Sequence, residues 1–421
     1  MRKKSHIIVI SKNKFVLTAI CLLFCFALIT VFMKILSLRT PAVIKHSDPS
    51  YVILAANDMG MHCYQRSFSD FMILPPGNNL RVQVFKNNGK TAELINSGIS
   101  VSYKIIDNTY SAQKINFWQY AADYGYDVAP DIGITGNGLS GEMKLSSDSK
   151  FYEATAIPIT PYNDGSRELN PYQLASITVY DSDTGKMLAA TENVVVPVSD
   201  EMDCGICHGA TDTDVNILRS HDRLSGTQLA SELAGGKRYK CSDCHQDNIL
   251  GMPKKDDIPP LSQAMHGFHA DKMAQSSVKP ECYSCHPGPI TQCYRSVMST
   301  VVSCAEACHG NMKNIAQTQA DGRRAWLDEP NCGMCHRELY AVNANQLYRN
   351  SYLINNSNPE MNGIILCISC HNGPHAEWKS TNSKDNLLPQ SLLGYASYIN
   401  RCTVCHEGTG KIHQKIINGQ R

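Results

Sequence analysis

CGICH (Cys204 to His208) is the first of six copies of one five-residue pattern in the second half of this 421-residue chain. A seventh copy, CAEACH (Cys304 to His309), has one additional residue between its cysteines. The pattern C-x-x-C-H is typical of covalently attached c-type haem, because two thiols bond to the porphyrin and the adjacent histidine binds the iron. We therefore predict seven haem c groups. The predicted cofactor-binding residues are Cys204, Cys207, His208, Cys241, Cys244, His245, Cys282, Cys285, His286, Cys304, Cys308, His309, Cys332, Cys335, His336, Cys367, Cys370, His371, Cys402, Cys405 and His406.

Zinc sites and disulfides are the alternatives for cysteines this closely spaced. A zinc site needs two cysteine pairs around one ion, and it does not require a histidine after every second cysteine. Seven short disulfide loops would leave seven histidines unexplained. Haem therefore accounts for the pattern better than either alternative.

The variant CAEACH leaves two attachments open. Thioether bonds through Cys304 and Cys308 require the additional residue to bulge out of the motif, and this is the smaller departure from the regular spacing. Attachment through Cys293 and Cys308 is the alternative, with Cys304 then a free thiol or part of a disulfide. We favour Cys304 and Cys308.

Each low-spin iron also needs a second axial ligand. If His6 is set aside, seven histidines lie outside the motifs, which is the number of predicted haems. His46 is one of these, but it can also be a linker residue. For each of the others, the alternative is a surface histidine or one that binds a haem propionate. The candidate distal ligands of haem iron are His62, His221, His266, His269, His375 and His413.

The spacing of these candidates suggests which haems they serve. His266 and His269 are three residues apart, so they would share one helix face and can serve two neighbouring haems. His375 follows His371 by four residues and cannot easily reach the opposite face of the same iron, so it is expected to serve another haem. The 218 residues from 204 to 421 leave about 31 residues for each motif, too few for separate cores. We expect the haems to fill the interior, surrounded by short helices and loops.

Residues 50–200 predict a β-rich domain. Its β-branched and aromatic runs alternate apolar with polar residues and are separated by turn sequences such as NNGK and DSDTGK, as in an antiparallel sandwich. The stretch Asn57 to Phe71 contains Met61, His62 and Cys63 in sequence. A blue-copper site would need a second histidine nearby, which is missing before the motif region. His62 or Met61 capping a haem iron and a buried, hydrogen-bonded His62 beside a packed Cys63 are both open interpretations. The predicted strands are Tyr51–Ala56, Leu80–Phe85, Ile99–Ile106, Phe151–Thr160, Leu174–Tyr180 and Met187–Val198.

The N-terminus predicts a membrane anchor. A basic segment (1–14) precedes an uncharged apolar run (15–33), whose length of about 28 Å as a helix matches a bilayer core. Its flanking charges predict a cytoplasmic N-terminus, an inner-membrane location and a periplasmic position for the rest of the chain. A cleaved signal peptide is the alternative. The net charge of +1, from 39 basic and 38 acidic residues, gives no indication of a nucleic-acid partner.

Residues 204 to 421 resemble the periplasmic and surface multihaem c-type cytochromes of respiring bacteria. The seven motifs carry the resemblance, together with CHNGPHA (Cys370 to Ala376) and WLDEPNCGMCH (Trp326 to His336). It implies electron transfer through closely packed haems and does not fix the donor or acceptor. We expect a carrier in a respiratory chain, with redox proteins or a quinol-linked donor as partners. The predicted fold is α+β, a β-sandwich-like domain (50–200) followed by a mostly helical and loop multihaem domain (201–421). The alternative is a multihaem oxidoreductase of a small nitrogen or sulfur compound, which needs one open iron position. CAEACH is the preferred candidate for that position, and the C-x-x-C-K motif of pentahaem nitrite reductases is absent.

Overall fold

The computed structural model describes residues 45–46, 48, 50–89, 91–277, 282–288, 290–328, 330, 350, 352–353 and 363–406. Helices and predominantly antiparallel sheets are both present in these ranges, which confirms the mixed α+β class. The strands are β1 (Lys45–His46), β2 (Tyr51–Ala56), β3 (His62–Cys63), β4 (Phe71–Met72), β5 (Asn78–Asn87), β6 (Ala92–Leu94), β7 (Ile99–Ile106), β8 (Ser140–Glu142), β9 (Lys144–Leu145), β10 (Tyr152–Ile157), β11 (Tyr172–Asp181), β12 (Met187–Ser199) and β13 (Tyr239–Lys240). The α-helices are α2 (Phe117–Tyr120), α3 (Gly205–His208), α4 (Thr213–Ser225), α5 (Leu229–Ala234), α6 (Leu261–Gln275), α7 (Met312–Ala320), α9 (Cys367–His371) and α10 (Leu387–Leu393).

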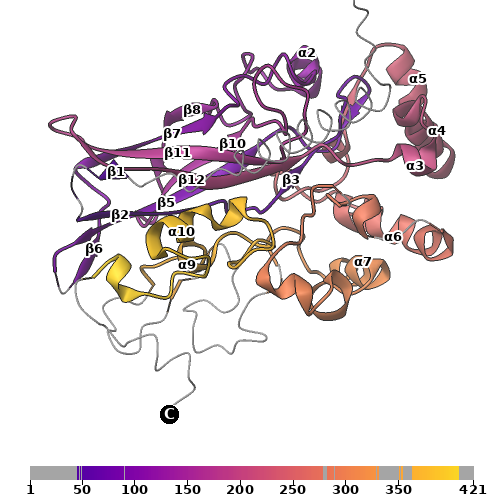
Figure 1. Cartoon of the computed structure of the whole chain (residues 1–421). Helices are drawn as coiled ribbons and strands as arrows, with labels where there is room; N and C mark the ends of the chain where they lie inside the picture. The colour runs from indigo at the N-terminus through magenta and orange to yellow at the C-terminus, as the bar shows by residue number, and fades with distance from the viewer. Residues whose placement is uncertain are drawn as a thin grey trace, which may run out of the picture. The chain divides into compact units, whose positions relative to one another are not determined.

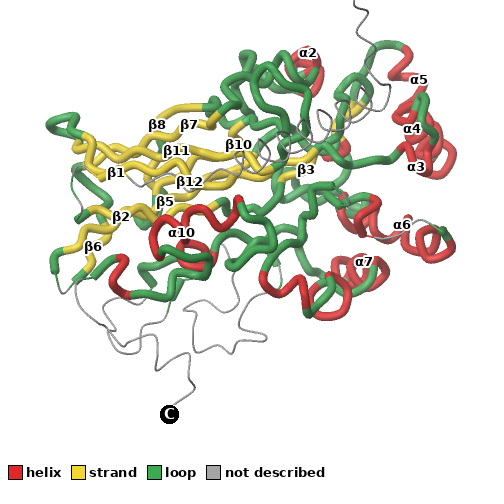
Figure 2. Tube along the Cα trace, in the orientation of Figure 1, coloured by secondary structure: helices red, strands yellow, loops and turns green. Residues whose placement is uncertain are grey.

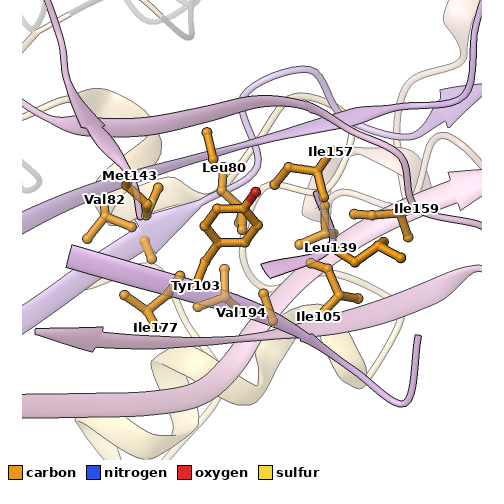
Figure 3. Close-up of a cluster of buried hydrophobic side chains, with 14 of the residues drawn as sticks. Leu80, Val82, Tyr103, Ile105, Leu139, Met143, Ile157, Ile159, Ile177 and Val194 are labelled. Carbon is orange, nitrogen blue, oxygen red and sulfur yellow. The ribbon is translucent and has the colours of Figure 1, made fainter. Parts of the chain in front are cut away.

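Two sheets enclose the principal hydrophobic core. One has the strand order β1-β12-β11-β7-β8 with β3 alongside β12, and the other has the order β2-β5-β10-β9 with β6 alongside β5 (Figure 1). Alternate residues of each strand point inward, as Val101, Tyr103 and Ile105 do in β7. Inward-facing side chains from both sheets meet in one cluster (Figure 3). All six runs predicted as strands from their composition form strands here.

The outer face of the β2–β5 sheet is covered by the C-terminal motifs. The Gln83 side chain of β5 donates to the Ile364 carbonyl at 2.8 Å and accepts from the Leu366 amide at 3.0 Å and the Ser369 hydroxyl at 2.8 Å. Val52, Leu54 and Phe85 pack against Ile364, Ile365, Val404 and Cys405. The β-rich part and motifs 367–371 and 402–406 therefore share packed interfaces within one compact unit.

Residues 201–328 consist mainly of short helices and loops (Figure 2). Helices α6 and α7 pack side by side, since an added Cβ at Gly267 would lie 3.4 Å from Ala316 Cβ, and Gln319 donates to the Ser262 hydroxyl at 2.9 Å. The buried apolar side chains of the described residues in this range are only Leu218, Ala270, Met273 and Pro287. A segment of this length ordinarily buries a larger apolar core.

The predicted single-pass inner-membrane location is corrected by the structure. In the part of the chain that is described, no helix is long and apolar enough to cross a bilayer. The longest, α6, has 15 residues, about 22 Å at the α-helical rise, against about 30 Å for a hydrocarbon core. The predicted basic segment (1–14) and anchor (15–33) lie outside the described residues.

Candidate functional site

Four of the motifs share one local backbone arrangement. In the regular copies, the amide of His208, His245 or His286 donates to the carbonyl of the first cysteine of the same motif, at 3.0, 3.0 and 2.9 Å. In CAEACH the same bond closes over one more residue, from the His309 amide to the Cys304 carbonyl at 3.0 Å. Residues Cys304–Cys308 form a turn of π-helix, which is how a helix accommodates one inserted residue. The variant thus keeps the first cysteine and the histidine in the regular relation.

Each of these four motif histidines lies opposite a histidine from outside the motifs. The ring centroids are 6.4 Å apart for His208 and His269, 6.3 Å for His221 and His245, 6.1 Å for His266 and His286, and 6.0 Å for His309 and His375. The sequence nominated these four partners as distal ligands without assigning any of them to a motif.

The ring separations fit two imidazoles that share one metal. With a metal–nitrogen bond of about 2 Å and a nitrogen about 1 Å from its ring centre, two rings on opposite sides of a metal have centroids about 6 Å apart. Two imidazoles fill only two coordination positions, so the remaining positions need an additional ligand set. In each motif the two cysteines directly precede the histidine of the pair.

Helix α6 positions two of these histidines with the same device. His266 Nδ1 lies 2.7 Å from the Ser262 carbonyl, and His269 Nδ1 lies 2.8 Å from the Met265 carbonyl. Each acceptor precedes its histidine by four residues, so regular helix geometry places it there. With Nδ1 occupied, Nε2 is the nitrogen left to bind a metal, as in most histidine metal sites.

The α4–α5 corner positions His221. The Asp222 carboxylate accepts from the amides of Leu229 and Ala230, at 2.7 and 2.9 Å, and so caps α5. It also accepts from the Thr227 hydroxyl at 2.7 Å, and that hydroxyl lies 2.9 Å from His221 Nδ1. On the opposite side, His245 Nδ1 lies 2.8 Å from the Pro259 carbonyl. Both rings of this pair are therefore held at their Nδ1 edges.

His375 is held by the stretch that the sequence left unexplained. Its φ of +64° is costly for a residue with a side chain, and such backbone persists only where the surroundings enforce it. A Cβ added at Gly60 would lie 2.9 Å from the Pro374 carbonyl oxygen, and one at Gly373 would lie 2.2 Å from the Asn57 carbonyl oxygen. The Asn57–Gly60 loop therefore packs directly on the segment that carries His375.

Burial favours the neutral form of several of the paired imidazoles, which is the form that binds a metal. Burial, together with the charge of nearby His309, lowers the pKa of His286 and of His375 to about 4. Burial also lowers the pKa of His208 and of His266. These rings are thus available as ligands across the neutral pH range.

The thiols show which motifs are neighbours. Cys204 lies close enough to Cys241 and to Cys285 for their charges to interact. Cys304 hydrogen-bonds with Cys282, which lowers the pKa of the Cys304 thiol to about 6. The first four motifs are therefore arranged in the order second, first, third, fourth.

Large apolar side chains are exposed around the same motifs. Val301 is 78% exposed and Ile290 is 67% exposed, and both lie between the third and fourth motifs. Ile206 lies inside the first motif, and Met265 and Phe268 lie on α6. Of the ten large apolar side chains that are exposed in the described residues, only Leu145 lies before residue 200. This distribution fits surfaces that a large apolar group would cover.

The other predicted residues are placed differently. His62 is buried in β3 with Nε2 2.8 Å from the Pro75 carbonyl, and burial lowers its pKa; this favours the interpretation of a hydrogen-bonded core histidine. Cys63 follows it in β3, and burial raises its pKa. The His371 ring stacks on Tyr398 at 5.3 Å, a contact that no motif indicated. Cys332, Cys335, His336 and His413 lie outside the described residues.

No family model and no curated protein sequence matches the chain. Within the described ranges, no group of three or more His, Cys, Asp or Glu side chains is placed to hold a metal ion. The assignment of a function therefore depends on the motifs and on the histidine pairs.

Proposed function

We propose that the chain is a multihaem c-type cytochrome that carries electrons between redox partners, with haem c attached at its seven motifs. The observation that supports this most strongly is the four imidazole pairs, each with one ring from a motif and ring centroids 6.0 to 6.4 Å apart. The same separation therefore recurs at four pairs that involve four different motifs.

The chain's own residues define what each site would do. The two thiols of a motif would form the covalent links, and the following histidine would bind the iron through Nε2. Haem c, when bound, would supply a one-electron iron couple and a broad apolar face. Carbonyl and hydroxyl oxygens at Nδ1, such as those of Ser262 and Thr227, would orient the rings and raise their basicity.

The packing of the motif region supports the same proposal. Residues 201–328 bury few apolar side chains of their own, while Ile206, Phe268 and Val301 are exposed beside the motifs. Bound haem would cover these side chains and complete the interior. The neighbouring order of the first four motifs would then keep successive irons close, as electron transfer requires.

Carrier function fits the CAEACH motif better than catalysis does. The alternative function, an oxidoreductase, would have its open iron position there, but His375 lies opposite His309 with centroids 6.0 Å apart. Two axial imidazoles would leave no position for a substrate. The partners we propose are redox proteins or a quinol-linked donor.

The pair of histidines on α6 provides the test. H266A and H269A should each convert one low-spin iron per chain to a high-spin form, and the two variants should affect different irons, as read by electron paramagnetic resonance (EPR) of the oxidised protein. H62Q is the matched control and should leave the spectrum unchanged, because His62 Nε2 faces Pro75. Intact mass should give the haem count. A colourless protein, or identical spectra for H266A and H269A, would contradict the proposal.

A further inference from the structure

One candidate axial histidine has a different hydrogen-bond partner from the others. Where contacts of Nδ1 are resolved in the first three pairs, the partner is an oxygen atom, from Thr227, Pro259, Ser262 or Met265, at 2.7 to 2.9 Å. Nδ1 of His375 instead faces the Sγ atom of Cys293 at 3.8 Å. The site formed by His309 and His375 therefore has a sulfur atom where the others have oxygen.

The sulfur is held in place by a buried framework. The Cys293 amide donates to the Pro287 carbonyl at 2.9 Å, and its carbonyl accepts from Arg295 Nη1 at 3.1 Å. The Arg295 amide donates to the His375 carbonyl at 2.8 Å, which links the two segments directly. The Arg295 guanidinium in turn makes two bonds to Asp385, at 2.6 and 3.0 Å, and both side chains are almost fully buried. Cys293 and His375 are thus fixed relative to each other.

The position of the sulfur argues against Cys293 as an attachment residue. It contacts Nδ1 of His375 at 3.8 Å, which leaves Nε2 of that ring as the nitrogen to bind a metal. The regular closing bond from His309 to Cys304 also leaves the fourth motif with its own first cysteine. Of the two attachments that the sequence left open, this favours Cys304 and Cys308.

A sulfur acceptor has a predictable effect on the metal. Thiol sulfur accepts hydrogen bonds weakly, and an Nδ1 bond to a stronger acceptor makes the imidazole a stronger electron donor to its metal. A stronger donor stabilises the ferric state and lowers the reduction potential. We propose that Cys293 is the positioning residue of His375 and that its weak hydrogen bond gives this iron a higher reduction potential than an oxygen acceptor would. The inference rests on the proposed function.

Substitution of Cys293 in the full-length holoprotein tests this. C293S introduces an oxygen acceptor and should lower the midpoint potential of one haem. We expect the ratio of reduced to oxidised haem at a fixed potential to fall by up to about tenfold, which is a shift of about 59 mV for one electron. Redox titration followed by EPR of the low-spin signals measures it. C63S is the matched control, because Cys63 is a half-buried thiol near Cys293 that lies in β3, and it should leave every midpoint unchanged.

The outcomes separate this inference from the proposed function. A wild-type protein without covalent haem would remove the proposed function itself. C293S with a full haem count and no shifted midpoint would overturn the role of Cys293, and so would a loss of one haem by intact mass, since Cys293 would then be an attachment residue. If C293S does not fold, pulsed EPR on the unaltered protein can detect the Nδ1 nitrogens of the axial histidines. One of these nitrogens should have a weaker hydrogen bond than the rest. Equivalent signals from all of them would refute the inference.

Discussion

Replacing Gly60 with alanine should destabilise the protein more than its backbone conformation alone explains. Gly60 has a φ of +76°, and a side chain in this region costs about 1–2 kcal/mol. The added Cβ would also lie 2.9 Å from the Pro374 carbonyl oxygen and 3.8 Å from His375 Nδ1. Forcing such a contact in packed structure costs about 1–3 kcal/mol more. The expected loss of unfolding free energy is therefore about 2–5 kcal/mol.

Gly98 provides the matched control, since its φ is +69° and an added Cβ there would meet nothing within 4 Å. G98A should lose only the part of the unfolding free energy that comes from the positive φ, about 1–2 kcal/mol. Denaturant unfolding followed by circular dichroism measures both variants, and G60A should in addition perturb the EPR signal of the iron that we propose His375 binds. Equal losses for G60A and G98A, with unchanged spectra, would show that the Asn57–Gly60 loop does not hold His375.

Two further predictions concern buried charges. R295M leaves Asp385 buried without its cation and should reduce the free energy of unfolding, measured by urea titration, by about 3–5 kcal/mol. Adding D385L to R295M removes the unpaired carboxylate and should restore part of this loss. A double variant as unstable as R295M would contradict the pairing. Burial and the nearby Asp70 raise the pKa of Asp214 to about 6, so the folded protein retains a proton that the unfolded chain releases between about pH 4 and 6. The free energy of unfolding of the wild type should therefore fall relative to that of D214N as the pH rises through this window. Urea titrations of both proteins at about pH 4 and at about pH 6 measure this. The same difference between the two proteins at both pH values would contradict the prediction.

The strands could be predicted from the sequence because their pattern is local. Runs such as Tyr51–Ala56 and Ile99–Ile106 are rich in β-branched residues and are separated by turn residues, and the strands have these bounds. The seven motifs could also be read directly from the sequence, since each is a short local pattern of two cysteines and a histidine.

The histidine pairs could not be predicted, because each joins residues far apart in the sequence. Only tertiary structure decides that His269 faces His208 while His266 faces His286. The role of the Asn57–Gly60 loop was hidden for the same reason: its contact with Gly373 spans more than 300 residues and follows from backbone shape. The Nδ1 acceptors on α6 could have been found earlier, since a histidine in a helix has a carbonyl four residues before it.

Helix α6 fixes the spacing between two histidines that we propose as iron ligands. His266 and His269 are separated along the helix axis by about 4.5 Å, a distance that an α-helix cannot stretch. Inserting one residue between them would swing one ring by about 100° around the axis and disconnect it from its partner. The loops around α6 can therefore differ in length without any change in the spacing of these two histidines.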